Sequence, residues 1–117
     1  MKHILLSCFN DSTNDELPVA LDWAKTLLNL FPNKYRITVL LHGECIKYSL
    51  KKNNRRKKII KKLHNDGVRF RVCKYCLEND GFSIDDVIRF IKPIKFSVDY
   101  IVKCQSRGIH IINDEKN

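Results

Sequence analysis

Glycine is scarce in this sequence, with four glycines among 117 residues. No two of them stand in a G-x-G or G-x₄-G-K spacing, which argues against the phosphate-binding loops of dinucleotide-binding and P-loop proteins. No apolar run approaches the roughly 20 residues that a membrane-spanning helix needs. No Ser/His/Asp arrangement for nucleophilic catalysis can be argued either. The sequence therefore indicates neither nucleotide chemistry nor a hydrolase triad, and we expect no membrane partner.

The amino-terminal segment lacks the features of a secretory signal peptide. Residues 1–6 have one lysine and a very short apolar stretch, without a small-residue cleavage site. Five cysteines in a chain without such a signal argue for a reducing compartment and against a disulfide framework. We therefore expect a cytoplasmic protein. Its length predicts one domain over residues 1–117, with residues 113–117 as a polar, frayed tail.

The excess positive charge is concentrated in one segment. Of the 22 lysines and arginines, nine lie in residues 47–62, which contain no acidic residue, and the other 13 balance 13 acidic residues. This basic segment is either a solvated face or a surface for an acidic partner, RNA or a membrane. Apart from Tyr48 it has no interleaved aromatic residue, and the chain has no signature of an RNA-binding module, which argues against RNA.

Hydrophobic periodicity divides the chain into alternating strands and helices. Short apolar or alternating runs predict strands at residues 4–8, 37–41, 68–72 and 109–112. Apolar residues at helical spacing predict helices at 18–31, 46–50, 59–63, 83–91 and 97–107. Strands that alternate with helices form a parallel or mostly parallel sheet with helices on both of its faces. We therefore expect an α/β fold, in which chemistry gathers at the carboxyl ends of the strands.

Two of these segments carry more specific predictions. Residues 68–72 alternate apolar side chains with two arginines, a pattern that a central strand covered on both faces would not tolerate. This strand is therefore predicted to lie at an edge, or to turn its arginine face toward something polar such as another subunit. Ser83 and Asp86 resemble a capping box with Asp in the place of Glu. They predict a helix through about Ile91, which Pro93 breaks.

The motif with the clearest chemistry is Cys73-x-x-Cys76, where a strand gives way to a helix. A helix N-terminus and the Lys74 cation would both stabilise a thiolate. A structural zinc site needs four ligands, and the sequence offers no second C-x-x-C or His-x₃-His. A thioredoxin-type redox pair is expected after the first strand, whereas this pair follows the third. A persulfide-carrying cysteine with a helper thiol fits the location best, with two unreactive thiols as the simpler interpretation.

A second group of reactive side chains follows the neighbouring strand, in the His-Gly-Glu-Cys sequence of residues 42–45. His42 is a candidate proton donor or acceptor near the reactive sulfur, or else a structural histidine that is satisfied by its neighbours. Cys8 and Cys104 lie in apolar stretches and are interpreted as small hydrophobic residues. No metal-binding or cofactor-binding residues are predicted.

Several segments together, in order and spacing, resemble the DsrE/DsrF-like family of small sulfur-metabolism proteins. The matching segments are the opening strand with Asn10-Asp11, then His42-Gly43-Glu44, then Gly67-Val68-Arg69-Phe70 leading into Cys73-x-x-Cys76-Leu77 and Gly81, and the closing helix from Val98 to Gly108. The resemblance covers nearly the whole chain. It departs from the family's pattern at Cys45, where relatives often have glycine, and in the basic insertion after Leu50.

This resemblance implies both a fold and an activity. The implied fold is a flavodoxin-like, three-layer α/β sandwich with a mostly parallel sheet of about five strands, assembled into homotrimers or hexamers. DsrE and TusD subunits use a cysteine at the end of this strand as a sulfur acceptor, and counting back from Gly81 that position corresponds to Cys73. Cys76 then matches the second cysteine of the family members that have two.

Two hypotheses of different classes follow. The first is a sulfur-relay, sulfurtransferase-like protein in which Cys73, with help from Cys76 and His42, carries a persulfide between donor and acceptor proteins. The alternative is a non-catalytic oligomeric subunit that uses the basic segment of residues 47–62 to contact an acidic partner or RNA.

Overall fold

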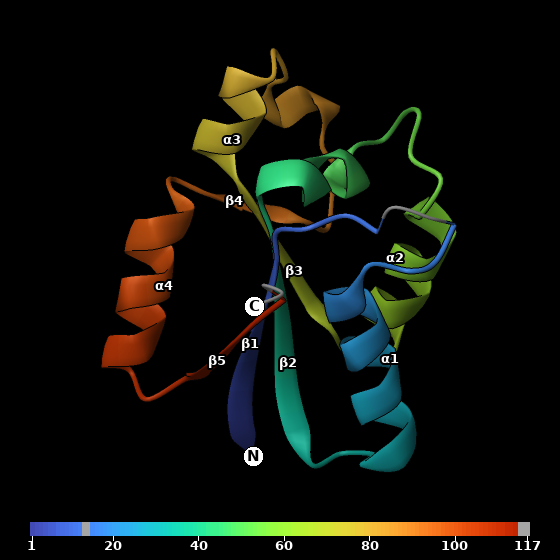
Figure 1. Cartoon of the computed structure of the whole chain (residues 1–117), viewed down its shortest axis with the longest axis vertical. Helices are drawn as coiled ribbons and strands as arrows, with labels where there is room; N and C mark the ends of the chain where they lie inside the picture. The colour runs from blue at the N-terminus through green and yellow to red at the C-terminus, as the bar shows by residue number, and fades with distance from the viewer. Residues whose placement is uncertain (13–14, 115–117) are drawn as a thin grey trace.

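A computed structural model describes residues 1–12 and 15–114 of the chain. Its elements, in chain order, are β1 (Lys2–Cys8), α1 (Val19–Leu30), β2 (Tyr35–Leu41), the 3₁₀ helix η1 (Gly43–Ser49), α2 (Lys57–Asn65), β3 (Arg69–Cys73), α3 (Lys74–Asn79), the 3₁₀ helix η2 (Ile84–Asp86), β4 (Lys92–Ile94), α4 (Ser97–Ser106) and β5 (His110–Asn113). Figure 1 shows α1 and α2 on one side of the strands and α4 on the other.

The five strands form one sheet in the order β4-β3-β2-β1-β5, and every pair in it is parallel. The first three connections step in one direction across the sheet, and the last returns past β1. Because crossovers between parallel strands are right-handed, the return must place α4 on the face opposite to α1 and α2 (Figure 1). The predicted α/β class with a sheet between two helical layers is confirmed, with a strand order that differs from the 2-1-3-4-5 order of flavodoxin itself.

The two faces of the sheet are buried to different extents. The main core lies on the face of α1 and α2 and contains large side chains such as Leu6, Leu21, Val39, Leu41, Ile60, Leu63, Phe70 and Val72. The core under α4 is small and consists of Leu5, Leu40 and Cys104 with partly buried neighbours. β1 and β2 contribute to both cores, which explains why their sequences are almost continuously apolar.

Of the two alternatives predicted for the arginine-containing strand, the edge position is wrong, and a polar contact of its arginine face stays a prediction. β3 lies between β2 and β4, and the edge is the three-residue strand β4. Pro93 in β4 is compatible with an edge because that position need not donate to a further strand. On β3, Arg69 is exposed and Arg71 is half-buried. Residues 68–72 therefore alternate because α4 covers only part of its face of the sheet, so that arginine side chains on that face are tolerated.

The helix predicted from Ser83 through Ile91 is also wrong beyond its first turn. The capping box of Ser83 and Asp86 is present, but η2 ends at Asp86. Val87 then pairs with Leu50 in an isolated antiparallel bridge, and the N–H of Ile88 donates to the carbonyl of Ser49 at 2.8 Å. Val87 and Ile88 are both buried, so their burial against the core outweighs the local helical signal.

The first two residues of the predicted tail, Asn113 and Asp114, are part of the folded structure. Asn113 ends β5, and Asp114 is buried with 4% of its surface exposed. Residues 115–117 lie outside the described part of the chain. Within residues 1–12 and 15–114, the structure contains no helix that is both long enough and apolar enough to span a bilayer.

Candidate functional site

The Cys73-x-x-Cys76 motif lies at the carboxyl end of β3, where the strand passes directly into α3. Cys73 is the N-cap of α3, and the backbone N–H of Cys76 donates to its Sγ at 3.4 Å. The two residues differ in burial, because Cys73 has no exposed surface and Cys76 is half-buried. The junction thus holds one sealed thiol with a more accessible thiol next to it.

Cys76 opens onto a shallow hollow of about 380 Å³. The other residues that line it are Phe9, Gly43, Glu44, Asn79 and Asp80. Gly43 lines this hollow together with Cys76, and its backbone N–H acts to lower the pKa of the Cys76 thiol. Gly43 has a positive φ of 56°, and a Cβ at this position would lie 2.5 Å from the ring of Phe9. A glycine is therefore needed here for Phe9 to pack against the backbone that lines the hollow.

The protonation of Cys76 is the reverse of what its place near a helix N-terminus predicts. Burial raises the pKa of Cys76 to about 11, and the neighbouring Cys73 thiol acts in the same direction. The backbone N–H of Gly43 has a smaller, opposite effect. The predicted help from Lys74 is weakened because its Nζ lies 3.7 Å from a carboxylate oxygen of Glu78. At neutral pH Cys76 is therefore a protonated thiol, and it needs a base before it can attack.

His42 directly follows β2 at the same edge of the sheet. Leu41 pairs with Val72 in the β2–β3 register, so His42 and Cys73 occupy the next positions of adjacent strands. The imidazole is buried, and its Nε2 lies 2.6 Å from the hydroxyl oxygen of Ser7. Burial lowers the pKa of His42, with a smaller opposing effect from Asp114. A neutral imidazole of this kind can accept a proton at neutral pH.

Two residues at this edge were not predicted from the sequence. Ser7 interrupts the apolar run of β1, and that interruption was a usable signal for a polar contact. Asp114 had no such signal, because its partners are more than 100 positions away. Its Oδ2 accepts hydrogen bonds from the backbone N–H groups of Phe9 and Asn10, each at 2.9 Å. Asp114 therefore fixes the start of the β1–α1 loop, which lines the Cys76 hollow.

The structure also brings together two cysteines that the sequence did not pair. Cys8, at the end of β1, and Cys45, in η1, both belong to the main core and have no exposed surface. The neighbouring Cys45 thiol, together with burial, raises the pKa of Cys8. Cys104 packs in the small core under α4. The interpretation of Cys8 and Cys104 as buried hydrophobic residues is confirmed. Among the described residues, no three His, Cys, Asp or Glu side chains are arranged to hold a metal ion.

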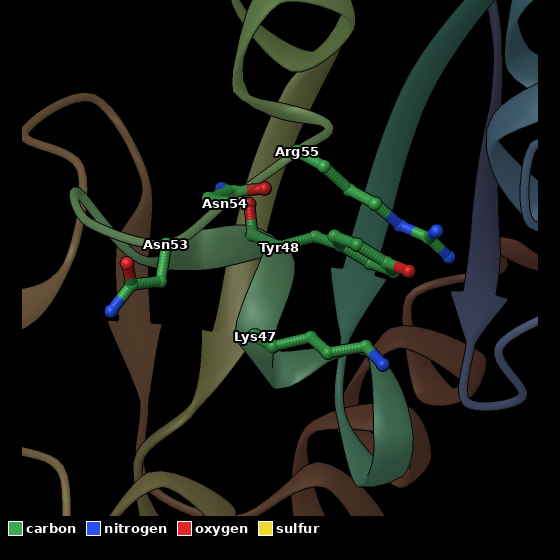
Figure 2. A pocket seen from close by; sticks show the side chains of 5 residues that line it. All are labelled: Lys47, Tyr48, Asn53, Asn54 and Arg55. Atoms are coloured by element: carbon green, nitrogen blue, oxygen red, sulfur yellow. Dashed lines mark hydrogen bonds between the residues drawn. The ribbon is translucent and has the colours of Figure 1, made fainter.

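Part of the basic segment holds the β1–α1 loop in place. Lys47 Nζ and the hydroxyl of Tyr48 each lie 2.6 Å from the carboxylate of Asp11. Figure 2 shows Lys47, Tyr48 and Arg55 pointing to the same side of a hollow, whereas Asn53 points away. Although partial burial opposes it, the hydrogen bonds from Lys47 and Tyr48 lower the pKa of Asp11. This end of the basic segment is therefore structural.

The fold matches several solved structures over almost the whole chain. The protein of unknown function MTH1491 from Methanobacterium thermoautotrophicum is 21% identical, with a TM-score of 0.80 over 97% of this chain and 99% of that one. The ychN protein from E. coli is 16% identical, with a TM-score of 0.76 and the same coverage. The conserved protein of unknown function BT1422 from Bacteroides thetaiotaomicron is 15% identical, with a TM-score of 0.75 over 96% and 94%.

These similarities concern the fold. They show that this α/β arrangement occurs in other proteins, and they carry no function. No protein-family model matches the sequence, and no curated protein matches it significantly. Sequence identities this low do not carry a site from one protein to another, so the chemistry of this chain has to be argued from its own residues.

Proposed function

We propose that this protein is a sulfur carrier that receives sulfur on Cys76 and holds it as a persulfide on Cys73. The observation that supports the proposal is that the buried sulfur of Cys73 and the accessible sulfur of Cys76 lie together at the end of β3. The backbone N–H of Cys76 donates a hydrogen bond to Cys73 Sγ. A persulfide is easily lost to other thiols, so a carrier benefits from keeping it away from solvent. The buried Cys73 position suits this purpose, and the Cys76 hollow suits exchange with a partner.

The transfer balances without an external oxidant or reductant. The Cys76 thiolate attacks the outer sulfur of a persulfide on a donor protein, and the sulfur–sulfur bond of the donor breaks. The donor sulfur leaves as a thiolate and takes up the proton that Cys76 released. Cys73 then attacks the outer sulfur of the Cys76 persulfide, which restores the Cys76 thiol and leaves the persulfide on Cys73. Delivery to an acceptor thiol follows the same steps in reverse.

Deprotonation is the step in which His42 takes part in this proposal. The raised pKa of Cys76 keeps its thiol protonated at neutral pH, so the resting protein is protected from stray electrophiles. His42 is neutral and adjacent in register to Cys73, and Ser7 orients its ring. The imidazole accepts the proton of the Cys76 thiol and passes it to the donor sulfur as that sulfur leaves.

We further infer that the carrier assembles as a homotrimer or homohexamer. Val98 and Val102 lie one turn apart on α4 and are each more than half exposed, next to the exposed Phe96. Several exposed apolar side chains on one short segment favour burial at an interface. Light scattering on the purified protein tests the inference, and substitution of both valines by glutamate is expected to yield monomers. A wild-type protein that is monomeric at all concentrations contradicts it.

Intact-protein mass spectrometry tests the sulfur-carrier proposal. After incubation with a cysteine desulfurase and cysteine, the wild type is expected to gain one sulfur that a reductant removes. Cys76→Ser is expected to abolish the gain, and Cys73→Ser to leave a smaller, short-lived adduct on Cys76. Cys104→Ser provides the matched control, because Cys104 is equally buried but lies under α4, and its adduct is expected to be unchanged. The absence of a sulfur adduct on both Cys73 and Cys76 would contradict the proposal.

A further inference from the structure

A strongly basic groove lies between α1 and α2, on the main-core side of the sheet. Its volume is about 560 Å³, and its lining consists of Leu17, Lys25, Arg55, Arg56, Lys58, Ile59 and Lys62. Lys58 and Lys62 are one turn apart on α2, and Lys25 comes from α1. The lining contains five cations, two apolar side chains and no acidic side chain. The groove is therefore a concave cationic surface with an apolar component.

Most of these cations are weakly compensated. Lys25 and Lys58 have no ion pair or hydrogen bond with any described residue. Lys62 pairs with Asp66 at 3.1 Å, but both side chains are largely exposed, so the pair is screened and weak. Like charges gathered around one hollow repel each other, and a ligand that carries several negative charges relieves this repulsion.

The two arginines of the groove are partly engaged by the β1–α1 loop. Arg55 pairs with Asp15, whose side chain is fully exposed, and Arg56 donates to the backbone carbonyls of Asp15 and Glu16. The Nε of Arg56 is buried and has no hydrogen-bond partner among the described residues. A buried donor without a partner is locally unfavourable.

The chemistry of the groove distinguishes an acidic peptide from a nucleic acid. Proteins that bind single-stranded nucleic acids combine a positively charged groove with exposed aromatic rings on which the bases stack. The groove lining contains no aromatic residue, and the ring of nearby Tyr48 is buried with its hydroxyl held by Asp11. Leu17 and Ile59 offer instead a place for an aliphatic side chain between the cations.

We propose that this groove is a docking site for an acidic segment of a partner protein, in which Asp or Glu residues flank an aliphatic side chain. The carboxylates contact Lys25, Lys58 and Lys62, and the aliphatic side chain contacts Leu17 and Ile59. The proposal goes beyond sulfur carriage and does not depend on it, because binding requires neither Cys73 nor Cys76.

Fluorescence anisotropy with a labelled short peptide, in which glutamates flank a central leucine, tests the docking site without any sulfur donor present. The Lys58→Glu/Lys62→Glu double variant is expected to weaken binding by about tenfold or more, since two attractive contacts become repulsive. Lys92→Glu/Lys95→Glu is the matched control, because it changes the net charge equally at exposed residues outside the groove. Its effect is expected to stay below about threefold. Circular dichroism checks that both variants fold.

Two further measurements address the apolar floor and the rival ligand. Replacement of the leucine by serine in the peptide is expected to weaken binding several-fold. A single-stranded RNA oligonucleotide of the same net charge is expected to bind more weakly than the peptide. The proposal is overturned by absence of peptide binding to the wild type, by equal losses in the two double variants, by insensitivity to the leucine, or by tighter binding of the RNA.

Discussion

The carboxyl edge of the sheet holds two pairs of neighbouring thiols, and the pairs differ in their access to solvent. Cys8 and Cys45 are both free, fully buried thiols that lie in the main core. Cys73 is just as buried, but its neighbour Cys76 opens onto the hollow beside Gly43. Both pairs therefore bring two sulfurs together, but only the Cys73 and Cys76 pair can be reached by a partner molecule. Solvent access is what distinguishes a candidate site from a contact inside the core.

The contrast between the pairs has a specific structural origin. Gly43 and Cys45 both belong to η1, so the same 3₁₀ helix lies beside Cys76 at the glycine and beside Cys8 at the cysteine side chain. At Gly43, η1 has no side chain, and the neighbouring Cys76 sulfur remains accessible. At Cys45, η1 has a side chain, and the neighbouring Cys8 sulfur is buried. A change at either position is therefore expected to alter this difference.

The largest expected effect is on alkylation rates. Under native conditions iodoacetamide is expected to label Cys76 at least ~100-fold faster than Cys8 or Cys45, since the sealed thiols require local unfolding before they react. The Cys76 rate is expected to rise about tenfold per pH unit and to level off near pH 11, where its pKa lies. Peptide mapping by mass spectrometry measures each site. Equal labelling of Cys8 and Cys76 would remove the distinction between the pairs.

The next largest effect is expected for Gly43→Ala. The added Cβ meets the ring of Phe9 at 2.5 Å in a backbone conformation with positive φ, so the free energy of unfolding is expected to fall by about 2–4 kcal/mol. Chemical denaturation measures this change. Gly81→Ala is the matched control, because Gly81 also has a positive φ, but a Cβ added there would have no atom within 4 Å. If the two variants lose equal stability, the contact with Phe9 is not what requires a glycine at position 43.

A smaller effect is expected at Asp114. Asp114→Ala leaves the backbone N–H groups of Phe9 and Asn10 without their acceptor, which is expected to lower the free energy of unfolding by about 1–3 kcal/mol. Asp114→Asn retains one acceptor oxygen and is expected to lose less. Iodoacetamide labelling of Cys76 is expected to become faster in Asp114→Ala, because the loop that lines its hollow loosens. Unchanged labelling would show that Asp114 acts on stability alone.

The smallest effect concerns the pH dependence of stability. The pKa of Cys76 is raised in the folded state, so its contribution to stability is fully present below about pH 9 and is lost as the pH rises to about 11. Because Cys76 is partly solvated, this contribution is expected to be at most about 1 kcal/mol. The difference between wild type and Cys76→Ser in urea denaturation isolates it from other titrating groups. A difference that does not change over this pH range contradicts the assignment of the raised pKa.

Much of the framework was predictable because it depends on local patterns. The apolar runs of β1 and β2, the amphipathic stripe of α1 and the closing helix were all identified from spacing along the chain. Residues 83–91 were misjudged because a capping box is a local signal, whereas the pairing of Val87 with Leu50 is decided by a distant segment. The edge assignment of β3 failed for the same kind of reason, since β4 is only three residues long and contains a proline.

The sequence by itself determined that Cys73 and Cys76 lie where a strand meets a helix, because periodicity and the C-x-x-C spacing are properties of neighbouring residues. Only the tertiary structure decided that Cys73 is sealed, that Cys76 is a protonated thiol beside Gly43, and that Asp114 holds the loop over the hollow. Burial and pKa depend on which distant segments pack around a group. The sequence placed nine cations in one segment, and the fold gave Lys47 a structural role at Asp11 and brought four others to a groove beside α1.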